Sequence, residues 1–259
     1  MEASKTEQMA KFWSERARQY AADPRANTND VWLREVEIAY VSRAIQEGSA
    51  ARALDFGCAN GFSTRRLAQA SPSLIFLGVD INSNMIDVAQ EQASRDPLPN
   101  LSFRCTDILN ESLNQNFDFI YTIRVFQNME SIDTQKRIFD RLFDFLEPGG
   151  LFLYIESYLD GYLTLNEDRQ KLDLPALPIH PHLTLLTQDF DNHVAKKMKL
   201  IKTDFLSSSY YFITRLVYSY MAKINNEEID YNHALHQIGA IVPQIGNYGP
   251  QRASLYIKA

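Results

Sequence analysis

The segment from Ala53 to Thr64 constrains the fold of this chain more than any other stretch. Its sequence, ALDFGCANGFST, is an apolar run of β character that enters a glycine-bearing turn. A helical pattern then runs from about Thr64 to Ala70. This order is typical of a strand, loop and helix corner, in which glycines let the backbone approach a ligand and the N–H groups at the helix start favour an electron-rich partner.

A second strand pattern follows at residues 74–79 and ends in Asp80. A carboxylate at the tip of the second strand of such a unit accepts hydrogen bonds from ribose hydroxyls, so the pair predicts an adenosine-binding site. A nicotinamide or flavin dinucleotide site is disfavoured. Its G-x-G-x-x-G frame, counted from Gly57, places Phe62 where a small residue must let helix and strand pack.

Strand and helix patterns alternate through residue 156, which predicts a doubly wound, mostly parallel sheet that binds ligands at the carboxyl ends of its strands. Strands are predicted at 53–56, 74–79, 101–105, 117–123 and 151–156, with helices at 64–70, 82–95 and 131–146 between them. Five polar residues fall at the predicted strand ends: Asp55, Asp80, Asp107, Arg124 and Glu156.

Two further regions flank this core. Helical patterns at 5–22 and about 30–46 precede the first strand, and a proline-rich insertion from 157 to 195 is predicted to be extended and stiff, a usual place for an acceptor site. Helices near 188–196 and 230–241, another ending near 223, and strands near 200–205 and 254–257 follow. We therefore predict one domain with an N-terminal helical lid (1–48), a ligand-binding core (49–156), and an acceptor-site insertion with the C-terminal strands (157–259).

The motif Asp55-x-Gly57-x-x-x-Gly61, with Asp80 and Thr106-Asp107-Ile108, resembles the cofactor site of class I S-adenosylmethionine-dependent methyltransferases. The resemblance covers roughly residues 52–156 and implies a Rossmann-like seven-stranded sheet with S-adenosylmethionine as cofactor. Ala59 departs from the family, which usually has a central glycine there. The implied cofactor-binding residues are Trp13, Tyr20, Asp55, Gly57, Cys58, Ala59, Gly61, Asp80, Ile81, Met85, Thr106, Asp107, Ile108 and Arg124.

The distal half loosely resembles small-molecule and sugar O-methyltransferases of bacterial polysaccharide and natural-product pathways. The similar pieces are Leu165-Asn166 with Arg169, the Leu-Pro run that ends at His182, Tyr210-Tyr211 and Tyr248-Gly249-Pro250. This resemblance implies O-methylation of a small polar metabolite, such as a sugar or a natural-product intermediate. It also implies an acceptor pocket lined by Tyr158, His180, Tyr210 and Tyr211.

Methyl transfer to a hydroxyl group gains from a general base, which is most often histidine. His182 matches the position of the base in the resembling family, and Glu156 or Asn128 is predicted to orient the acceptor. The other histidines, His193, His233 and His236, fall in helical patterns and are predicted to lie at the surface. Three different functions stay open: methylation of an amine or carboxylate, regulation by a protein that binds the adenosyl group without chemistry, and NAD-linked oxidoreduction.

Composition excludes several other classes. The net charge of -6 and the pI near 5.4 argue against nucleic-acid binding, which relies on clustered Lys and Arg. The two cysteines have no neighbours at metal-ligand spacing, so no metal is predicted. No run of about 18 apolar residues occurs and residues 1–5 lack a hydrophobic signal region, which predicts a cytoplasmic protein without a membrane partner. The expected partner is a small-molecule acceptor, and a homodimer is compatible with this interpretation.

Overall fold

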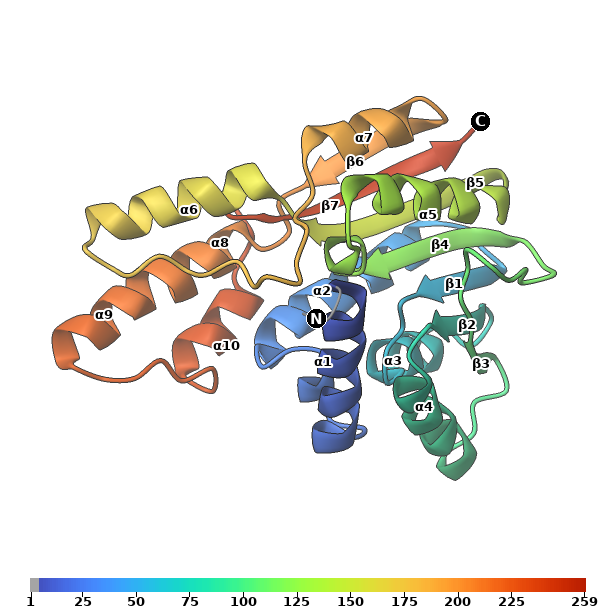
Figure 1. Ribbon diagram of the computed structural model, residues 1–259, viewed down its shortest axis with the longest axis horizontal. Helices are drawn as coiled ribbons and strands as arrows, with labels where there is room; N and C mark the ends of the chain where they lie inside the picture. Colours follow the sequence, from blue (N-terminus) through green and yellow to red (C-terminus); the bar gives the residue numbers. More distant parts are fainter. Residues whose placement is uncertain (1–4) are drawn as a thin grey trace.

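The computed structural model describes residues 5–259, and a seven-stranded sheet forms the centre of this part of the chain (Figure 1). The strand order is β3-β2-β1-β4-β5-β7-β6, in which β7 runs antiparallel to both neighbours and the other pairs are parallel. The predicted Rossmann-like, mostly parallel sheet is therefore confirmed. The strands are β1 (Arg52–Phe56), β2 (Ile75–Asp80), β3 (Leu101–Cys105), β4 (Phe117–Ile123), β5 (Leu146–Ser157), β6 (Met198–Asp204) and β7 (Gln251–Lys258).

Helices cover both faces of the sheet, because alternate residues of its central strands enter two separate cores. Phe119 and Tyr121 of β4 belong to a core shared with α2 and α3, whereas Ile120 belongs to a core shared with α5 and α7. The helices are α1 (Lys5–Tyr20), η1 (Pro24–Ala26), α2 (Val31–Glu47), α3 (Phe62–Ala70), α4 (Ser83–Arg95), η2 (Phe126–Asn128), α5 (Ile132–Asp144), α6 (Leu159–Lys171), α7 (Gln188–Ala195), α8 (Ser208–Tyr211), η3 (Phe212–Val217), α9 (Tyr218–Asn225) and α10 (Ala234–Ile241).

Side-chain caps fix where the helices near the carboxyl edge of the sheet begin. Asp30 accepts a hydrogen bond from the Leu33 N–H at 3.2 Å and so starts α2. Asn82 caps α4 in the same way through the Met85 N–H, also at 3.2 Å. Each cap satisfies a backbone donor that the helix leaves unpaired and fixes the angle at which the chain leaves the sheet edge.

Two elements differ from the sequence predictions. β5 begins at Leu146, about five residues before the predicted start, because residues 148–150 form an irregularity inside the strand rather than a break before it. Helix α6 occupies a segment predicted to be extended. Its buried positions are Gly161, Leu165 and Arg169. Leu165 is the single large apolar side chain among these three, so the apolar spacing that predicts a helix is absent. Only residues 172–187 of the insertion are irregular.

Helices α6 and α8 to α10 form a lobe beyond the ends at which β4 and β5 finish (Figure 1). The lobe is tied to α2 by a buried ion pair between Arg215 and Asp30, and Tyr210 donates a hydrogen bond to the same carboxylate. The sequence predicts His236 at the surface, but it is fully buried within the lobe with its Nε2 at 3.2 Å from Arg215.

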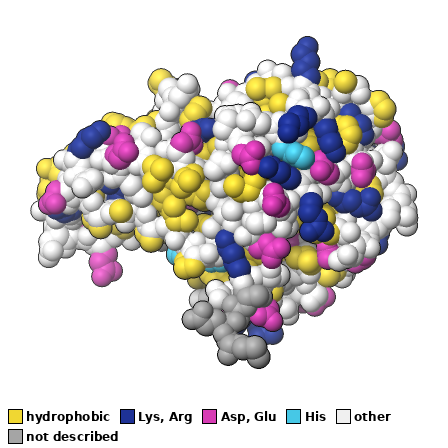
Figure 2. Space-filling view, turned by 45° about the horizontal axis from the view of Figure 1, so that its top comes forward, with side chains coloured by type: hydrophobic (Ala, Val, Ile, Leu, Met, Phe, Trp, Pro, Cys, Tyr) yellow, Lys and Arg dark blue, Asp and Glu magenta, His cyan; other side chains and the backbone are white. Residues whose placement is uncertain are grey.

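Hydrophobic side chains gather toward the lobe in Figure 2, whereas acidic and basic side chains alternate over the rest of that face.

Among the described residues, no helix has the length and apolar character needed to cross a bilayer. The predicted lack of a hydrophobic leader concerns mainly residues 1–4, which lie outside the described part of the chain.

We expect Gly161→Ala to destabilise the packing of α6 against the segment before β7. A Cβ atom at this position would lie 2.4 Å from the carbonyl oxygen of Gly249 and 2.8 Å from the Cα atom of Pro250, and neither backbone atom can swing aside. The free energy of unfolding in urea should fall by roughly 1–3 kcal/mol. Gln170→Ala, on the exposed face of α6, is the control and should change it by less than about 0.5 kcal/mol. Equal stability of Gly161→Ala and the unmodified protein would contradict this account.

Candidate functional site

A cavity of about 800 Å³ lies at the carboxyl edge of the sheet, bounded by the ends of β1 to β4, by α1 and by residues 180–183. Segments far apart in sequence meet here because parallel strands present their carboxyl ends at one edge. Most of the predicted site residues line the cavity: Trp13, Asp55, Gly57, Cys58, Ala59, Asp80, Ile81, Met85, Thr106, Asp107, Ile108, Arg124, Asn128, His180 and His182.

Other predicted site residues lie around the cavity without lining it. Tyr20 packs in a small apolar cluster with Trp13 and Ala59. The Tyr158 hydroxyl donates its hydrogen bond to Asp191, and the Tyr210 hydroxyl donates its hydrogen bond to Asp30. Neither hydroxyl can donate to a ligand while these contacts last. The structure therefore does not bring together all of the predicted acceptor-binding side chains; the predicted residues outside the cavity are Tyr20, Gly61, Glu156, Tyr158, Tyr210 and Tyr211.

The loop after β1 has the backbone conformation that its glycines predict. Gly57 has a φ of +77°, and Ala59, in place of the family's central glycine, adopts a left-handed φ of +48°. The N–H groups of Gly57 and Cys58 donate to the Val79 carbonyl at 2.8 and 3.0 Å, which ties the loop to β2. A Cβ atom at Gly57 would lie 2.4 Å from a Val125 methyl group, so this glycine also allows close contact with the turn after β4.

Two aspartates mark the half of the cavity at β2 and β3. Asp80 accepts from the Ala59 N–H at 2.9 Å through Oδ2 and from the Asn82 N–H at 2.8 Å through Oδ1, and burial raises its pKa. Asp107 accepts from the Leu109 N–H at 3.0 Å. Each carboxylate oxygen has more than one acceptor position, so both side chains are fixed by the backbone and can still accept hydrogen bonds from a ligand.

Asp55 lies deeper, at the end of β1. It is 3% exposed and accepts a hydrogen bond of 2.6 Å from the Thr64 hydroxyl on α3. Burial raises its pKa to about 6, although that hydrogen bond and the charge of Arg34 act in the opposite direction. The side chain therefore joins the strand end to the first turn of α3 and still reaches the cavity wall.

Glu156 is predicted by the sequence to orient the acceptor, but the structure places it outside the cavity, fully buried at the end of β5. Its Oε1 accepts from the N–H groups of Val125 and Phe126 at 2.7 and 2.9 Å, and its Oε2 accepts from the Gln127 N–H at 3.1 Å. Glu156 thus positions the turn after β4, whose residues line the cavity. Burial raises its pKa to about 7, against the opposing effect of the three N–H donors.

Several buried polar atoms in the cavity wall have no hydrogen-bond partner in the described part of the chain. Asn128 donates through Nδ2 to the Arg124 carbonyl at 2.7 Å, while its Oδ1 is unpartnered. The Ser63 hydroxyl at the start of α3 is unpartnered as well. Leaving buried polar groups unsatisfied costs free energy, so these atoms indicate a polar ligand.

His180 and His182 enter the cavity from the irregular part of the insertion. Their rings stack with centroids 5.6 Å apart, and the Phe12 ring of α1 lies 4.8 Å from His182. Burial lowers the pKa of His182, and the nearby His180 and Lys5 lower it further. A neutral imidazole at physiological pH can accept a proton.

Helix α1 closes over the cavity and contacts both of its sides. Lys5 donates through Nζ to the Thr184 hydroxyl at 2.6 Å, and Thr6 donates to Glu130 at 2.9 Å. Farther along the helix, Asn82 donates to the Ser14 hydroxyl at 3.0 Å. The N-terminal helical lid that the sequence predicts is therefore present over this cavity.

The sequence pattern does not mark Arg34 and Glu37 of α2 as site residues. Arg34 lines the cavity and is 6% exposed, and Glu37 is fully buried between Arg34 and Arg124. The available signal was an oppositely charged pair on the same helix face as Leu33 and Tyr40, where a purely structural helix would present apolar side chains to the core.

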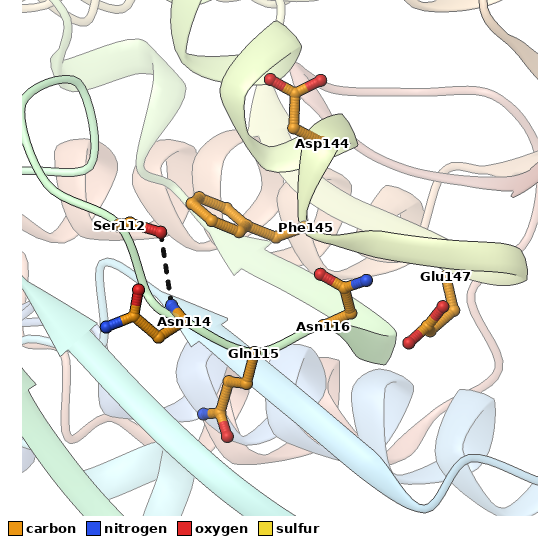
Figure 3. A pocket seen from close by; sticks show the side chains of 7 residues that line it. All are labelled: Ser112, Asn114, Gln115, Asn116, Asp144, Phe145 and Glu147. Carbon is orange, nitrogen blue, oxygen red and sulfur yellow. Dashed lines mark hydrogen bonds between the residues drawn. The ribbon is translucent and has the colours of Figure 1, made fainter.

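A smaller hollow of about 380 Å³ lies near the start of β4, away from the strand ends that form the cavity (Figure 3). Figure 3 shows the Asn114 N–H donating to the Ser112 hydroxyl on its rim. None of its lining residues carries a buried polar atom without a partner. We therefore assign no ligand to it. The described residues also include no group of three or more His, Cys, Asp or Glu side chains arranged to hold a metal ion.

Comparison with known proteins identifies similar chains. Residues 47–227 match the model of a family described as "Methyltransferase domain". Malonyl-[acyl-carrier protein] O-methyltransferase 2 of Ilyobacter polytropus is 31% identical over 121 residues, which cover 46% of this chain and 44% of that protein. Trans-aconitate 2-methyltransferase of Deinococcus radiodurans is 35% identical over 107 residues, 41% of this chain and 38% of that one. The chain thus matches less than half the length of these curated relatives.

A solved structure of similar fold is magnesium protoporphyrin IX methyltransferase of Synechocystis with bound S-adenosylhomocysteine. It superimposes with a TM-score of 0.65 over 99% of this chain and all of that one, at 13% sequence identity. At this identity the likeness establishes the shared fold alone.

The Glu156 carboxyl group should make stability depend on pH. Its pKa is about 7 in the folded protein against an ordinary value of 4.5, so its stabilising contribution is full below pH 4.5 and is lost as the pH rises through 7. In Glu156→Gln this dependence is absent. The difference in unfolding free energy between the two proteins should therefore change by at most about 3 kcal/mol over this pH window.

Urea denaturation at a series of pH values measures this difference, which also cancels the titration of Asp55. Glu91→Gln, at an exposed site on α4, serves as the control. A pH-independent difference between wild type and Glu156→Gln would show that this carboxyl group does not titrate in the window.

Proposed function

The chain belongs to the methyltransferase domain family, and on this premise we propose that it transfers a methyl group from S-adenosylmethionine to an oxygen atom of a small polar molecule. One observation carries the proposal. A single cavity combines strand-end carboxylates that suit an adenosine with two histidines that suit a hydroxyl acceptor. Sugars and natural-product intermediates are the acceptors that the resemblance of the distal half favours.

The residues at the ends of β2 and β3 fit the adenosine part of the donor. Asp80 accepts hydrogen bonds from the ribose hydroxyls, and Asp107 accepts from the adenine amino group. Ser63 Oγ and Asn128 Oδ1, which are buried without partners, offer further hydrogen bonds to a polar ligand. When bound, the donor supplies a methyl group activated by its sulfonium.

The remaining work is alignment, exclusion of water and removal of a proton. Glu156 fixes the turn after β4 beside the acceptor, and α1 keeps water from the cavity. His182 is neutral and takes the hydroxyl proton, with its ring held against Phe12. The His180 ring stacks on the ring of His182, with its centroid 5.6 Å from that of His182.

A carboxylate acceptor is the second candidate. The names of the two relatives, one acting on a malonyl group and the other on trans-aconitate, favour it. A carboxylate is already ionised at neutral pH, so its methylation needs no general base. No contact among the described residues of the cavity favours methylation of an amine. Binding of the adenosyl group without chemistry would leave His180 and His182 without a role.

We expect calorimetric titration to detect binding of S-adenosylmethionine and S-adenosylhomocysteine but not of NAD. Asp80→Ala removes the acceptor for the ribose hydroxyls and should lower the affinity for both sulfur nucleotides by roughly 10- to 100-fold. Asp96→Ala, at an exposed site paired with Arg65, is the matched control and should bind as the wild type does. Binding of NAD without the sulfur nucleotides would overturn the donor assignment.

His182→Ala should reduce kcat by roughly 10²- to 10⁴-fold if a hydroxyl group is methylated. Binding of S-adenosylhomocysteine should stay unchanged, because the imidazole is assigned to the acceptor. His193→Ala is the control, since His193 pairs with Asp140 outside the cavity. The assay follows methyl transfer to a panel of hydroxylated, carboxylated and aminated acceptors. Unchanged turnover of His182→Ala would exclude it as the base and favour a carboxylate acceptor.

A further inference from the structure

Three guanidinium groups converge on one side of the cavity. Arg16 comes from α1, Arg34 from α2 and Arg124 from the end of β4, and all three line the same space. Burial lowers the pKa of Arg34 to about 10, Glu37 opposes that shift, and the positive charge of Arg124 adds to it. Arg124 also contributes to a lowered pKa of Arg16. Arg124 is therefore close enough to repel each of the other two cations.

Glu37 is the carboxylate that separates two of these cations. Its Oε2 lies 3.4 Å from Arg34 Nη1 and accepts from Arg124 Nη2 at 3.2 Å, and its Oε1 accepts from Gln251. Glu37 is thus shared by two guanidinium groups, and the charge of Asp55 also acts on Arg34. One carboxylate cannot satisfy both guanidinium groups, so Arg124 keeps the capacity to bind an anion.

Both arginines have hydrogen-bonding capacity that the protein does not use. Arg34 is 6% exposed, and its Nε–H has no partner within the described residues. Arg124 Nε lies 3.0 Å from Glu37 Oε1 but lacks hydrogen-bond geometry, so it too is unpartnered. A planar guanidinium with free N–H groups is the side chain best matched to a carboxylate or phosphate oxyanion.

The backbone presents Arg124 in a fixed orientation. This residue has a left-handed φ of +58°, which a non-glycine residue adopts at a cost. Its N–H donates to the Ile155 carbonyl at 2.7 Å, and its carbonyl accepts from Asn128 at 2.7 Å. The surrounding structure thus maintains a strained conformation that directs this side chain to Glu37 and the cavity.

Asp55, held by the Thr64 hydroxyl, interacts with the charge of Arg34, whereas three other acidic side chains of the cavity make their contacts elsewhere. Asp80 and Asp107 stand at the ends of β2 and β3, and Glu130 is held by Thr6 and Thr134. S-adenosylmethionine carries a sulfonium, an ammonium and a single carboxylate, so it brings net positive charge and its carboxylate can pair with only one of the guanidinium groups. An anionic second ligand can pair with the other.

We propose that Arg124, which the resemblance assigns to the donor, instead binds an oxyanion of the methyl acceptor together with Arg34, so that the acceptor is an acidic small molecule. This inference rests on the proposed function and narrows it. The oxyanion is a carboxylate or phosphate group remote from the methylated oxygen when the acceptor is a hydroxyl. When the acceptor is a dicarboxylate, one carboxylate is held and the other is methylated.

The test separates an oxyanion of the acceptor from the carboxylate of the donor. Protein saturated with S-adenosylhomocysteine, whose own carboxylate is already in place, is titrated with malonate and with uncharged malonamide. We expect malonate to bind and malonamide not to bind. Arg124→Gln should lower the affinity for malonate by at least about tenfold and change the affinity for S-adenosylhomocysteine by less than about twofold.

Two variants serve as controls. Arg66→Gln removes an exposed arginine that pairs with Glu35 away from the cavity and should bind malonate as the wild type does. Glu37→Gln combined with Arg124→Gln removes one charge of each sign, so it keeps the net charge of the buried cluster should Arg124→Gln fold poorly. The double variant should also lose malonate binding while keeping S-adenosylhomocysteine.

Three results would overturn the inference. Equal binding of malonate and malonamide, or no binding of malonate to the saturated wild type, excludes an oxyanion site while the donor site stands. A loss of S-adenosylhomocysteine affinity in Arg124→Gln, with methylthioadenosine affinity kept, assigns the arginines to the donor's carboxylate. Failure of the wild type to bind S-adenosylhomocysteine is a different result, because it overturns the proposed function and this inference with it.

Discussion

The hydrogen bonds from three consecutive backbone N–H groups to Glu156 fix the turn after β4, which forms one wall of the cavity. A buried carboxylate is stable only when it is hydrogen-bonded or paired, and these donors face it because β4 and β5 end side by side. The turn that they fix presents Arg124 and Asn128 to the cavity. The same contacts hold Glu156 fully buried outside the cavity wall.

Helix α2 connects this site to the distal lobe through charged residues one to two turns apart. Asp30 at its start pairs with Arg215 and accepts from Tyr210 of the lobe, and Glu37 holds Arg124 at the cavity. Because both carboxylates are buried on a rigid helix, the position of the lobe and the position of the arginine cluster are set by one element. The insertion and the C-terminal segment are thereby part of the site's framework.

The sequence was sufficient to predict the sheet and the cavity edge at the ends of β1 to β3, because strand patterns, glycines and strand-end aspartates such as Asp80 are local signals. It did not predict α6, whose inward face is built around Gly161 and Arg169. It also missed the arginine cluster, since Arg34 and Arg124 are brought together by Glu37 only after folding. Position at a strand end likewise placed Glu156 near the site but did not reveal which way its carboxylate points.

The contact between Gly57 and Val125 limits how this protein can acquire new substrates. The loop after β1 and the turn after β4 touch there, and the space next to Gly57 is filled by Val125 methyl groups. A larger side chain in place of Val125 would press directly on the loop after β1. In the proposed function the loop meets the donor and the turn meets the acceptor, so changes of acceptor preference are expected to arise through neighbouring positions of the turn or through the insertion.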